Sequence, residues 1–397
     1  MQGDTHTSRR SVIPVQHKPV RILHIVARMD RGGVETWLMH AMRKFDRAEF
    51  QFDFLLTDKT PGTFDAEIER LGGRIIICSG RHAFFSYCRK FLQSLRTHGP
   101  YDVVHSHVHH ASGITLALAR FAGVKMRIAH SHVDMRLARS SKGALRRCYL
   151  LLMRRQIRQF MTHGLACSVP AAEDLFGMKW RADKRVQIMP YGIDLNVFRE
   201  RPNKADLRSR LALPADAIVI GHVANFSPAK NHLFLLEIAA EAMRQDGRIW
   251  LVLVGDGELK AQAEQHAREL GISKRVKFLG TRADVPQLMM GAMDVFLFPS
   301  LFEGLPVVLI EAQAAGLPCV ISGRITKESD TRGAVIARHD PSEPTATWAA
   351  TVLKMLNPAS SGNTRDDGAA TGAPAIETFG ILNSVKTLAG LYASSRP

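Results

Sequence analysis

The segment of residues 298–319, FPSLFEGLPVVLIEAQAAGLPC, most strongly constrains what this chain can fold into. The apolar run Val295–Phe298 at its start predicts a buried strand. Pro306 suits the first turn of a helix, because its missing N–H is not needed there, and the Gly-Leu-Pro sequence that follows ends the helix. Glu303 therefore precedes a helix N-terminus, and Glu311 lies inside the helix, roughly 7 Å further along its axis than Pro306.

Two acidic residues that flank a helix N-terminus suggest a particular chemistry. The free N–H groups at the start of a helix form a ready site for an anion. A carboxylate on each side of a diphosphate-sized site suits a nucleotide-sugar, with one group for sugar hydroxyls and the other for ribose hydroxyls. For an isolated pair of glutamates, a helix cap and a solvated side chain would be the simpler interpretation.

Length and composition restrict the class of protein. A chain of 397 residues can form two or three domains. Its five cysteines are scattered without a C-x-x-C pair, which argues against a disulfide framework or a cysteine zinc site and favours the reducing cytoplasm. No run of 18 apolar residues predicts a spanning helix. Residues 1–18 lack the apolar core of a signal peptide and are expected to form a disordered tail.

Strands and helices alternate along both halves of the chain, which predicts an α/β fold of two doubly wound domains. Histidines gather where two strands of the first half end, in the sequences His105-Ser106-His107 and His130-Ser131-His132. Ligands of such sheets bind at the carboxyl ends of the strands, so these histidines fit the wall of a cleft. A zinc site is the alternative. Because no carboxylate or cysteine completes a ligand set, we expect no metal ion.

The acidic segment resembles the E-x7-E signature of retaining glycosyltransferases of family four, and the resemblance extends from about Arg21 to about Tyr392. It implies the GT-B fold, in which two Rossmann-like domains face each other across a cleft. It also implies transfer of a sugar from a UDP- or GDP-linked donor to a hydroxyl acceptor with retention of configuration, without a cofactor. The most similar members build exopolysaccharide, capsule or lipopolysaccharide on lipid-linked acceptors. A non-catalytic partner subunit and a nucleotide-sugar epimerase of the same fold are the alternatives.

The same resemblance suggests the domain boundaries. Tyr191-Gly192-Ile193-Asp194 is similar to the connector N-G-x-D of the family, with Tyr191 in the usual place of asparagine. We expect an acceptor-side domain at residues 19–190 and a donor domain at residues 191–375. A final helix at residues 376–397 is expected to cross back to the first domain. Residues 358–374, rich in Ala, Gly, Ser and Thr, read as a mobile loop.

The resemblance also assigns residues of the donor domain. The segment from Asn225 to Lys230 is similar to the R-x4-K clamp that holds the donor diphosphate. Lys230 matches the lysine, whereas Asn225 occupies the arginine position and cannot supply charge. The remaining donor contacts expected are Glu303 with the N–H groups near Gly304 and Leu305 for sugar and phosphate, Glu311 for the ribose, and the loop at Arg282 for the base.

On the acceptor side, Gly33 follows Gly32 between a strand and a helix, where backbone can approach a phosphate. In the family this loop touches the donor phosphate or the acceptor. A histidine near the reacting sugar is implied after the strand Met126–Ala129, and His132 matches it better than His130. His107 is a further acceptor-side candidate.

A net charge of +16 calls for an anionic partner. Residues 135–172 contain no acidic residue and eight basic ones. They predict a helix that carries Arg147, Arg154 and Arg158 on one face, with an apolar stripe opposite: Leu145, Tyr149, Leu152, Met153 and Phe160. Either this stripe packs into the core of the domain, or the helix lies on an anionic membrane surface. Nothing resembles a nucleic-acid-binding module, so we expect no nucleic acid among the partners. We expect a cytoplasmic protein, bound peripherally to the inner face of the plasma membrane in the second case.

Overall fold

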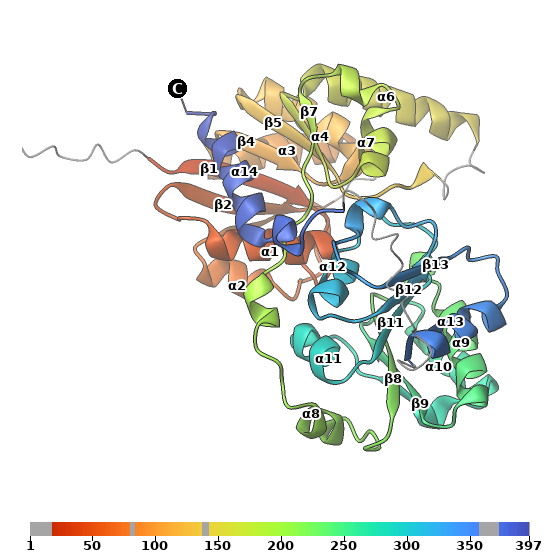
Figure 1. Cartoon of the computed structure of the whole chain (residues 1–397). Coiled ribbons are helices and arrows are strands. Elements are labelled where there is room, and N and C mark those ends of the chain that lie inside the picture. Colours follow the sequence, from red (N-terminus) through yellow and green to blue (C-terminus); the bar gives the residue numbers. More distant parts are fainter. Residues whose placement is uncertain (1–17, 80–83, 137–142, 357–372, 397) are drawn as a thin grey trace, which may run out of the picture.

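The chain forms two α/β domains, seen one above the other in Figure 1. The computed structural model describes residues 18–79, 84–136, 143–356 and 373–396. Almost all of the predicted N-terminal tail and most of the predicted loop at residues 358–374 lie outside the described residues. The prediction of two doubly wound parallel-sheet domains is confirmed.

The first domain is built on a seven-stranded sheet of order β3-β2-β1-β4-β5-β6-β7, in which every neighbouring pair is parallel. Its strands are β1 (Val20–Val26), β2 (Phe50–Leu56), β3 (Arg74–Ile77), β4 (Val103–Ser106), β5 (Met126–Ser131), β6 (His163–Ala166) and β7 (Val186–Ile188). The helices that cover it are α1 (Gly33–Lys44), α2 (Asp65–Arg70), α3 (Phe84–His98), α4 (Ser112–Phe121), α6 (Ala144–Phe160) and α7 (Val169–Phe176).

The second domain contains a six-stranded parallel sheet of order β10-β9-β8-β11-β12-β13. Its strands are β8 (Ile218–Val223), β9 (Ile249–Val254), β10 (Val276–Phe278), β11 (Val295–Phe298), β12 (Cys319–Ser322) and β13 (Ile336–His339). The helices are α8 (Lys204–Arg210), α9 (His232–Gln245), α10 (Lys260–Glu269), α11 (Val285–Gly291), α12 (Val307–Ala314) and α13 (Thr345–Leu356).

Both sheets reverse their strand order at one point, between β1 and β4 in the first and between β8 and β11 in the second. Ligands of doubly wound sheets bind at the carboxyl ends of the strands beside this switch. The loop after β1 leads to α1, and the loops after β8 and β11 carry Lys230 and Glu303. The topology therefore gathers most of the predicted site residues at the two switch points.

One local prediction was wrong. Pro306 is the N-cap residue of α12 and does not lie in its first turn, because its backbone is still extended, with φ −74° and ψ 101°. A proline ring fixes φ near this value in either conformation, so the sequence alone did not separate the two positions. The helix begins at Val307, one residue later than expected.

The last helix, α14 (Ile381–Ala393), packs on α1 and β1 of the first domain, as Figure 1 shows. The chain reaches it through a bridge between Ile193 and Gly380. The Tyr392 hydroxyl is within hydrogen-bond distance of His105 Nδ1, at 2.7 Å, and its ring is fully buried beside Phe45 and Phe52. The end of the chain thus completes the core of the first domain.

We expect Tyr392→Ala to lower the free energy of unfolding of the first domain by about 3–5 kcal/mol, the usual cost of removing a large buried ring. The change would also leave a buried nitrogen of His105 without its partner. Denaturant titration followed by circular dichroism measures the effect. Leu382→Ala on the same helix is the control, because Leu382 is 65% exposed and should change stability by less than about 0.5 kcal/mol. Equal effects of the two changes would contradict this account of α14.

Candidate functional site

The loop that joins β11 to α12 meets the first domain at Gly304. The Gly304 carbonyl accepts a hydrogen bond from Ser168 Oγ at 2.9 Å. A Cβ atom at Gly304 would lie 2.1 Å from the carbonyl oxygen of His132, a contact that backbone atoms cannot relieve. Glycine is therefore required here because two backbones from different domains approach each other.

Lys230 and Glu303 come together at this loop. Lys230 ends a short 3₁₀ helix after β8, and its Nζ lies 2.5 Å from Glu303 Oε1. The two side chains are only 19% and 11% exposed, and the ammonium also lies over the ring of Phe298. The structure thus unites the predicted phosphate-binding lysine with the glutamate that precedes α12.

The other predicted residues near α12 take different places. Gly33 begins α1, and a Cβ atom there would lie 3.9 Å from Val307 Cγ2, so the starts of α1 and α12 are neighbours. Leu305 is buried in the core of the first domain together with Val307. Glu311 lies inside α12, where burial raises the pKa of its carboxyl group to about 7.

Two predicted donor contacts have their side chains engaged elsewhere. Asn225 is exposed, and its side-chain oxygen accepts a hydrogen bond from Ser227 Oγ at 3.2 Å. The Arg282 guanidinium binds both carboxylate oxygens of Asp284, at 2.8 and 2.7 Å. The Arg282 carbonyl oxygen accepts a hydrogen bond from Arg31 of the first domain at 2.9 Å. At Arg282 the backbone, and not the guanidinium, therefore faces the other domain.

The predicted histidines of the first domain form a hydrogen-bonded group. His132 Nε2 lies 2.7 Å from His107 Nδ1, and His132 Nδ1 is hydrogen-bonded to the Tyr191 hydroxyl. His130 Nδ1 lies 3.1 Å from His105 Nε2. Burial lowers the pKa values of His107 and His132 well below the usual range, so both rings are neutral at physiological pH. Both ring nitrogens of His132 are thus engaged within the protein.

Sequence reasoning missed several residues that join the two domains. Glu328 accepts hydrogen bonds at 2.9 and 3.1 Å from the backbone N–H of Val169, the first residue of α7. This carboxylate lies at the positive end of the α7 dipole. Ser168, which bonds Gly304, is also the N-cap of α7. A serine is a common N-cap residue, so the sequence offered a signal for this role of Ser168, but nothing in the sequence indicated its second partner across the domain boundary.

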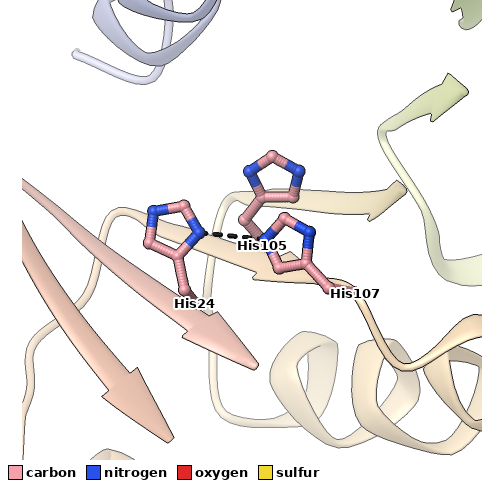
Figure 2. Close-up of side chains that lie close together, drawn as sticks. All are labelled: His24, His105 and His107. Atoms are coloured by element: carbon pink, nitrogen blue, oxygen red, sulfur yellow. Dashed lines mark hydrogen bonds between the residues drawn. The ribbon is translucent and has the colours of Figure 1, made fainter. Parts of the chain in front are cut away.

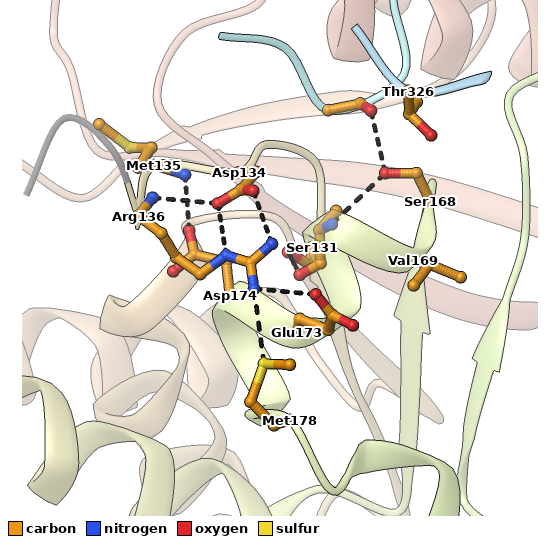
Figure 3. A network of polar contacts seen from close by, with 12 residues as sticks. Ser131, Asp134, Met135, Arg136, Ser168, Val169, Glu173, Asp174, Met178 and Thr326 are labelled. Carbon is orange, nitrogen blue, oxygen red and sulfur yellow. Dashed lines mark hydrogen bonds and ion pairs between the residues drawn. The ribbon is translucent and has the colours of Figure 1, made fainter. Parts of the chain in front are cut away.

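The segment that follows His132 is held on α7, as Figure 3 shows. The Arg136 guanidinium binds Asp134 and Glu173, each at 2.8 Å. The Met135 N–H donates to Asp174 Oδ2 at 2.8 Å. These bonds fix the loop after β5 against the helix that also carries the Ser168 contact.

The basic helix α6 differs from the simpler expectation. Met153 is buried, but Leu145, Tyr149 and Leu152 are exposed, with Leu145 at 89%, so the idea that the whole stripe enters the core is wrong. The guanidinium groups of Arg154 and Arg158 donate to the carbonyl oxygens of Asp174 and Phe176, both at 2.6 Å. These arginines cap the C-terminal end of α7, and part of the apolar stripe of α6 stays on the surface.

Comparison with known proteins decides the family. A model of the glycosyl transferase 4-like domain matches residues 32–192, and the model "Glycosyl transferases group 1" matches residues 203–329. EpsF of Bacillus subtilis, which carries the name "Putative glycosyltransferase EpsF", is 40% identical over 84% of this chain and 87% of its own. This chain belongs to the group 1 glycosyltransferases.

Two further relatives of this glycosyltransferase are informative. An Escherichia coli enzyme named UDP-Gal:α-D-GlcNAc-diphosphoundecaprenol α-1,3-galactosyltransferase is 31% identical over 77% of this chain and 80% of its own. The crystal structure of Anabaena HepE in complex with UDP-glucose superposes with a TM-score of 0.73 at 22% identity, covering 94% of this chain and 99% of HepE. The fold of the transferase is GT-B, as predicted.

We expect the stability of the glycosyltransferase to depend on Glu311. Its native pKa is raised from 4.5 to about 7, so the folded protein binds the proton more tightly than the unfolded chain does. Stability is therefore lost as pH rises from about 4.5 to about 7 and stays level above that, by no more than roughly 3 kcal/mol. Glu311→Gln should remove this loss, which denaturant titrations at pH 5 and pH 8 would measure. An identical pH dependence in Glu311→Gln and the wild type would contradict the assignment.

Proposed function

We propose that this transferase moves a sugar from a nucleoside-diphosphate-sugar to a hydroxyl of a lipid-linked acceptor, with retention, during exopolysaccharide or capsule synthesis. The observation that carries the proposal is the Lys230–Glu303 ion pair beside the start of α12, at the contact between the domains. It places a cation, a carboxylate and a helix N-terminus together. The named relatives, among them the capsular glycosyltransferase CapH of Staphylococcus aureus, support the pathway.

In this proposal the ion pair is exchanged when the donor binds. The diphosphate takes the Lys230 ammonium from Glu303, and Glu303 becomes free to accept hydrogen bonds from sugar hydroxyls. The departing diphosphate is then stabilised by Lys230 and by the N–H groups at the start of α12, without proton transfer. Because Asn225 carries no charge, Lys230 supplies a larger share of the binding than in a clamp with two cations.

Two features of the relatives favour UDP as the donor nucleotide. The Escherichia coli relative is named as using UDP-Gal, and HepE was crystallised with UDP-glucose. In our proposal Glu311 accepts hydrogen bonds from the ribose hydroxyls and the backbone at Arg282 contacts the base. Epimerase chemistry and a non-catalytic role find no support among these relatives, which are named as transferases.

We expect Lys230→Met to weaken donor binding by roughly 10- to 100-fold, because a charge-assisted bond to phosphate contributes about 1.5–3 kcal/mol. Glu303→Gln should lower kcat at least about tenfold with a smaller change in donor affinity. Calorimetry with a panel of UDP- and GDP-sugars measures the first effect, and transfer to a polyprenyl-diphosphate-sugar acceptor measures the second.

Lys274→Met is the matched control for Lys230, because Lys274 is an exposed lysine of the same domain, in a short 3₁₀ helix before β10. It should bind the donor as the wild type does. Wild-type turnover in Glu303→Gln would remove the site assignment, and equal losses in both lysine variants would show a non-specific charge effect.

We further propose that α6 docks the protein on the anionic, cytoplasmic leaflet that carries a lipid-linked acceptor. Leu145, Tyr149 and Leu152 follow the spacing of one helix face and are exposed. Arg146 and Arg147 lie beside them and are also exposed. Apolar side chains flanked by arginines suit the interface of an anionic bilayer. None of the described helices is long and apolar enough to span a membrane.

We expect the wild type to float with liposomes that contain anionic lipid at low salt and to bind less at high salt, because the lipid charge is then screened. The double change Leu145→Asp and Leu152→Asp should abolish flotation while leaving the fold intact. Leu382→Asp is the control and should float, because Leu382 on α14 is 65% exposed, between Leu152 at 51% and Leu145 at 89%. Failure of the wild type to float at low salt would refute the docking proposal.

A further inference from the structure

Five histidines from three neighbouring strands share one face of the first sheet. His24 of β1 and His105 of β4 are in register, and side chains two residues apart on a strand point to the same face. His107 therefore lies on the same side as His105, and so do His130 and His132 at the end of β5. Figure 2 shows His24, His105 and His107 gathered above the sheet. The sequence showed two clusters of histidines, but only the strand order brought them together and added His24 of β1.

Two triplets of these rings have nitrogen atoms close enough to share an ion. Among the described residues, His24, His105 and His107 form an inner triplet, and His107, His130 and His132 an outer one. In each triplet the available nitrogens lie within 4.8 Å of one another. Tetrahedral zinc, with Zn–N of about 2.0–2.1 Å, holds its ligand nitrogens roughly 3.4 Å apart, so small side-chain rotations would complete either set.

The two triplets differ in how their rings are supported by hydrogen bonds. A metal-bound histidine normally has its second ring nitrogen held by another group, which fixes the ring. In the outer triplet, His107 Nε2 is held by His24 at 3.0 Å, His130 Nδ1 by His105 at 3.1 Å, and His132 Nδ1 by the Tyr191 hydroxyl. All three rings are thus supported from behind.

The remaining nitrogens of the outer triplet are His107 Nδ1 and His132 Nε2, which are hydrogen-bonded to each other at 2.7 Å, and His130 Nε2. His130 Nε2 is buried and has no hydrogen-bond partner among the described residues. In the inner triplet, His24 faces His107 through Nδ1, so its other nitrogen, Nε2, would have to be held by a supporting group. His24 Nε2 has no hydrogen-bond partner among the described residues, and the ring therefore lacks support. His107 and His132 are also partly exposed, whereas His24 and His105 are fully buried. Access and support both favour the outer set.

We propose that His107, His130 and His132 bind a divalent transition-metal ion such as Zn²⁺ at the wall of the domain interface. Three imidazoles are a usual ligand set for Zn²⁺, with water or hydroxide in the fourth position. The partly exposed side of His107 and His132 provides that position. On binding, the ion takes the place of the hydrogen bond between His107 Nδ1 and His132 Nε2, and both rings stay neutral by a change of tautomer. His132 then carries its proton on Nδ1, toward Tyr191, and His107 carries its proton on Nε2, toward His24.

The sequence pattern alone favoured no metal ion, because no carboxylate or cysteine completed a set. The tertiary structure supplies the third ligand and the supporting shell from histidines and a tyrosine instead.

The test is a titration of the full-length, untagged protein with Zn²⁺ by calorimetry and with Co²⁺ by visible absorption. We expect one ion per chain and the intense visible bands of four-coordinate Co²⁺. His132→Gln should abolish both, because His132 belongs to the outer triplet alone. Tyr191→Phe keeps every ligand and should weaken Zn²⁺ binding by roughly 10- to 100-fold while retaining the Co²⁺ bands.

His163→Gln, a partly exposed histidine on β6, is the control for the other histidines of the chain and should bind as the wild type does. Circular dichroism establishes that each variant is folded. The proposal is overturned if folded His132→Gln still binds one Zn²⁺ with wild-type affinity, or if the wild type shows only the weak bands of six-coordinate Co²⁺. Should His132→Gln fail to fold, unchanged affinity in Tyr191→Phe overturns it instead.

Discussion

The contact between the backbone of Gly304 and that of His132 governs how the two domains of this transferase meet. It requires a residue without a side chain, because any Cβ atom would overlap the His132 carbonyl oxygen. Once the contact is made, Ser168 bonds the Gly304 carbonyl and Leu305 enters the first core. The start of α12 is then placed beside the start of α1. The proposed donor site therefore depends on two backbones that can approach closely.

The same contact couples the donor side of the protein to the histidines. His132 touches Gly304 through its backbone while its ring is held between Tyr191 and His107. His132 therefore belongs both to the domain contact and to the outer edge of the histidine group. Glu328 on the N-terminus of α7 and Arg31 on the Arg282 carbonyl add polar contacts across the same boundary. Contacts between domains of one chain are commonly polar, like those of transient protein interfaces.

Predictions from sequence were correct for structure that depends on residues close together along the chain. The strand, the turn and the helix around Glu303 follow from apolar runs and from Gly and Pro, and the structure places β11 and α12 within one residue of expectation. Lys230 and Glu303 were separate hypotheses from two loops, and the switch in strand order brought them within 2.5 Å. The prediction that the whole apolar stripe of α6 is buried was wrong, because a helical wheel shows which residues share a face but not which face is covered.

The sequence by itself determined the alternation of strands and helices, the position of the acidic loop and the family, since these depend on neighbours along the chain. The tertiary structure alone decided which partners each polar group finds across the domain boundary. It joined Ser168 to Gly304, engaged both nitrogens of His132 and assembled five histidines from three strands. The physical reason is that hydrogen bonds and ligand sets require distances of about 2–3 Å. Residues that lie from tens to more than a hundred positions apart reach such distances only when the sheets are built and packed.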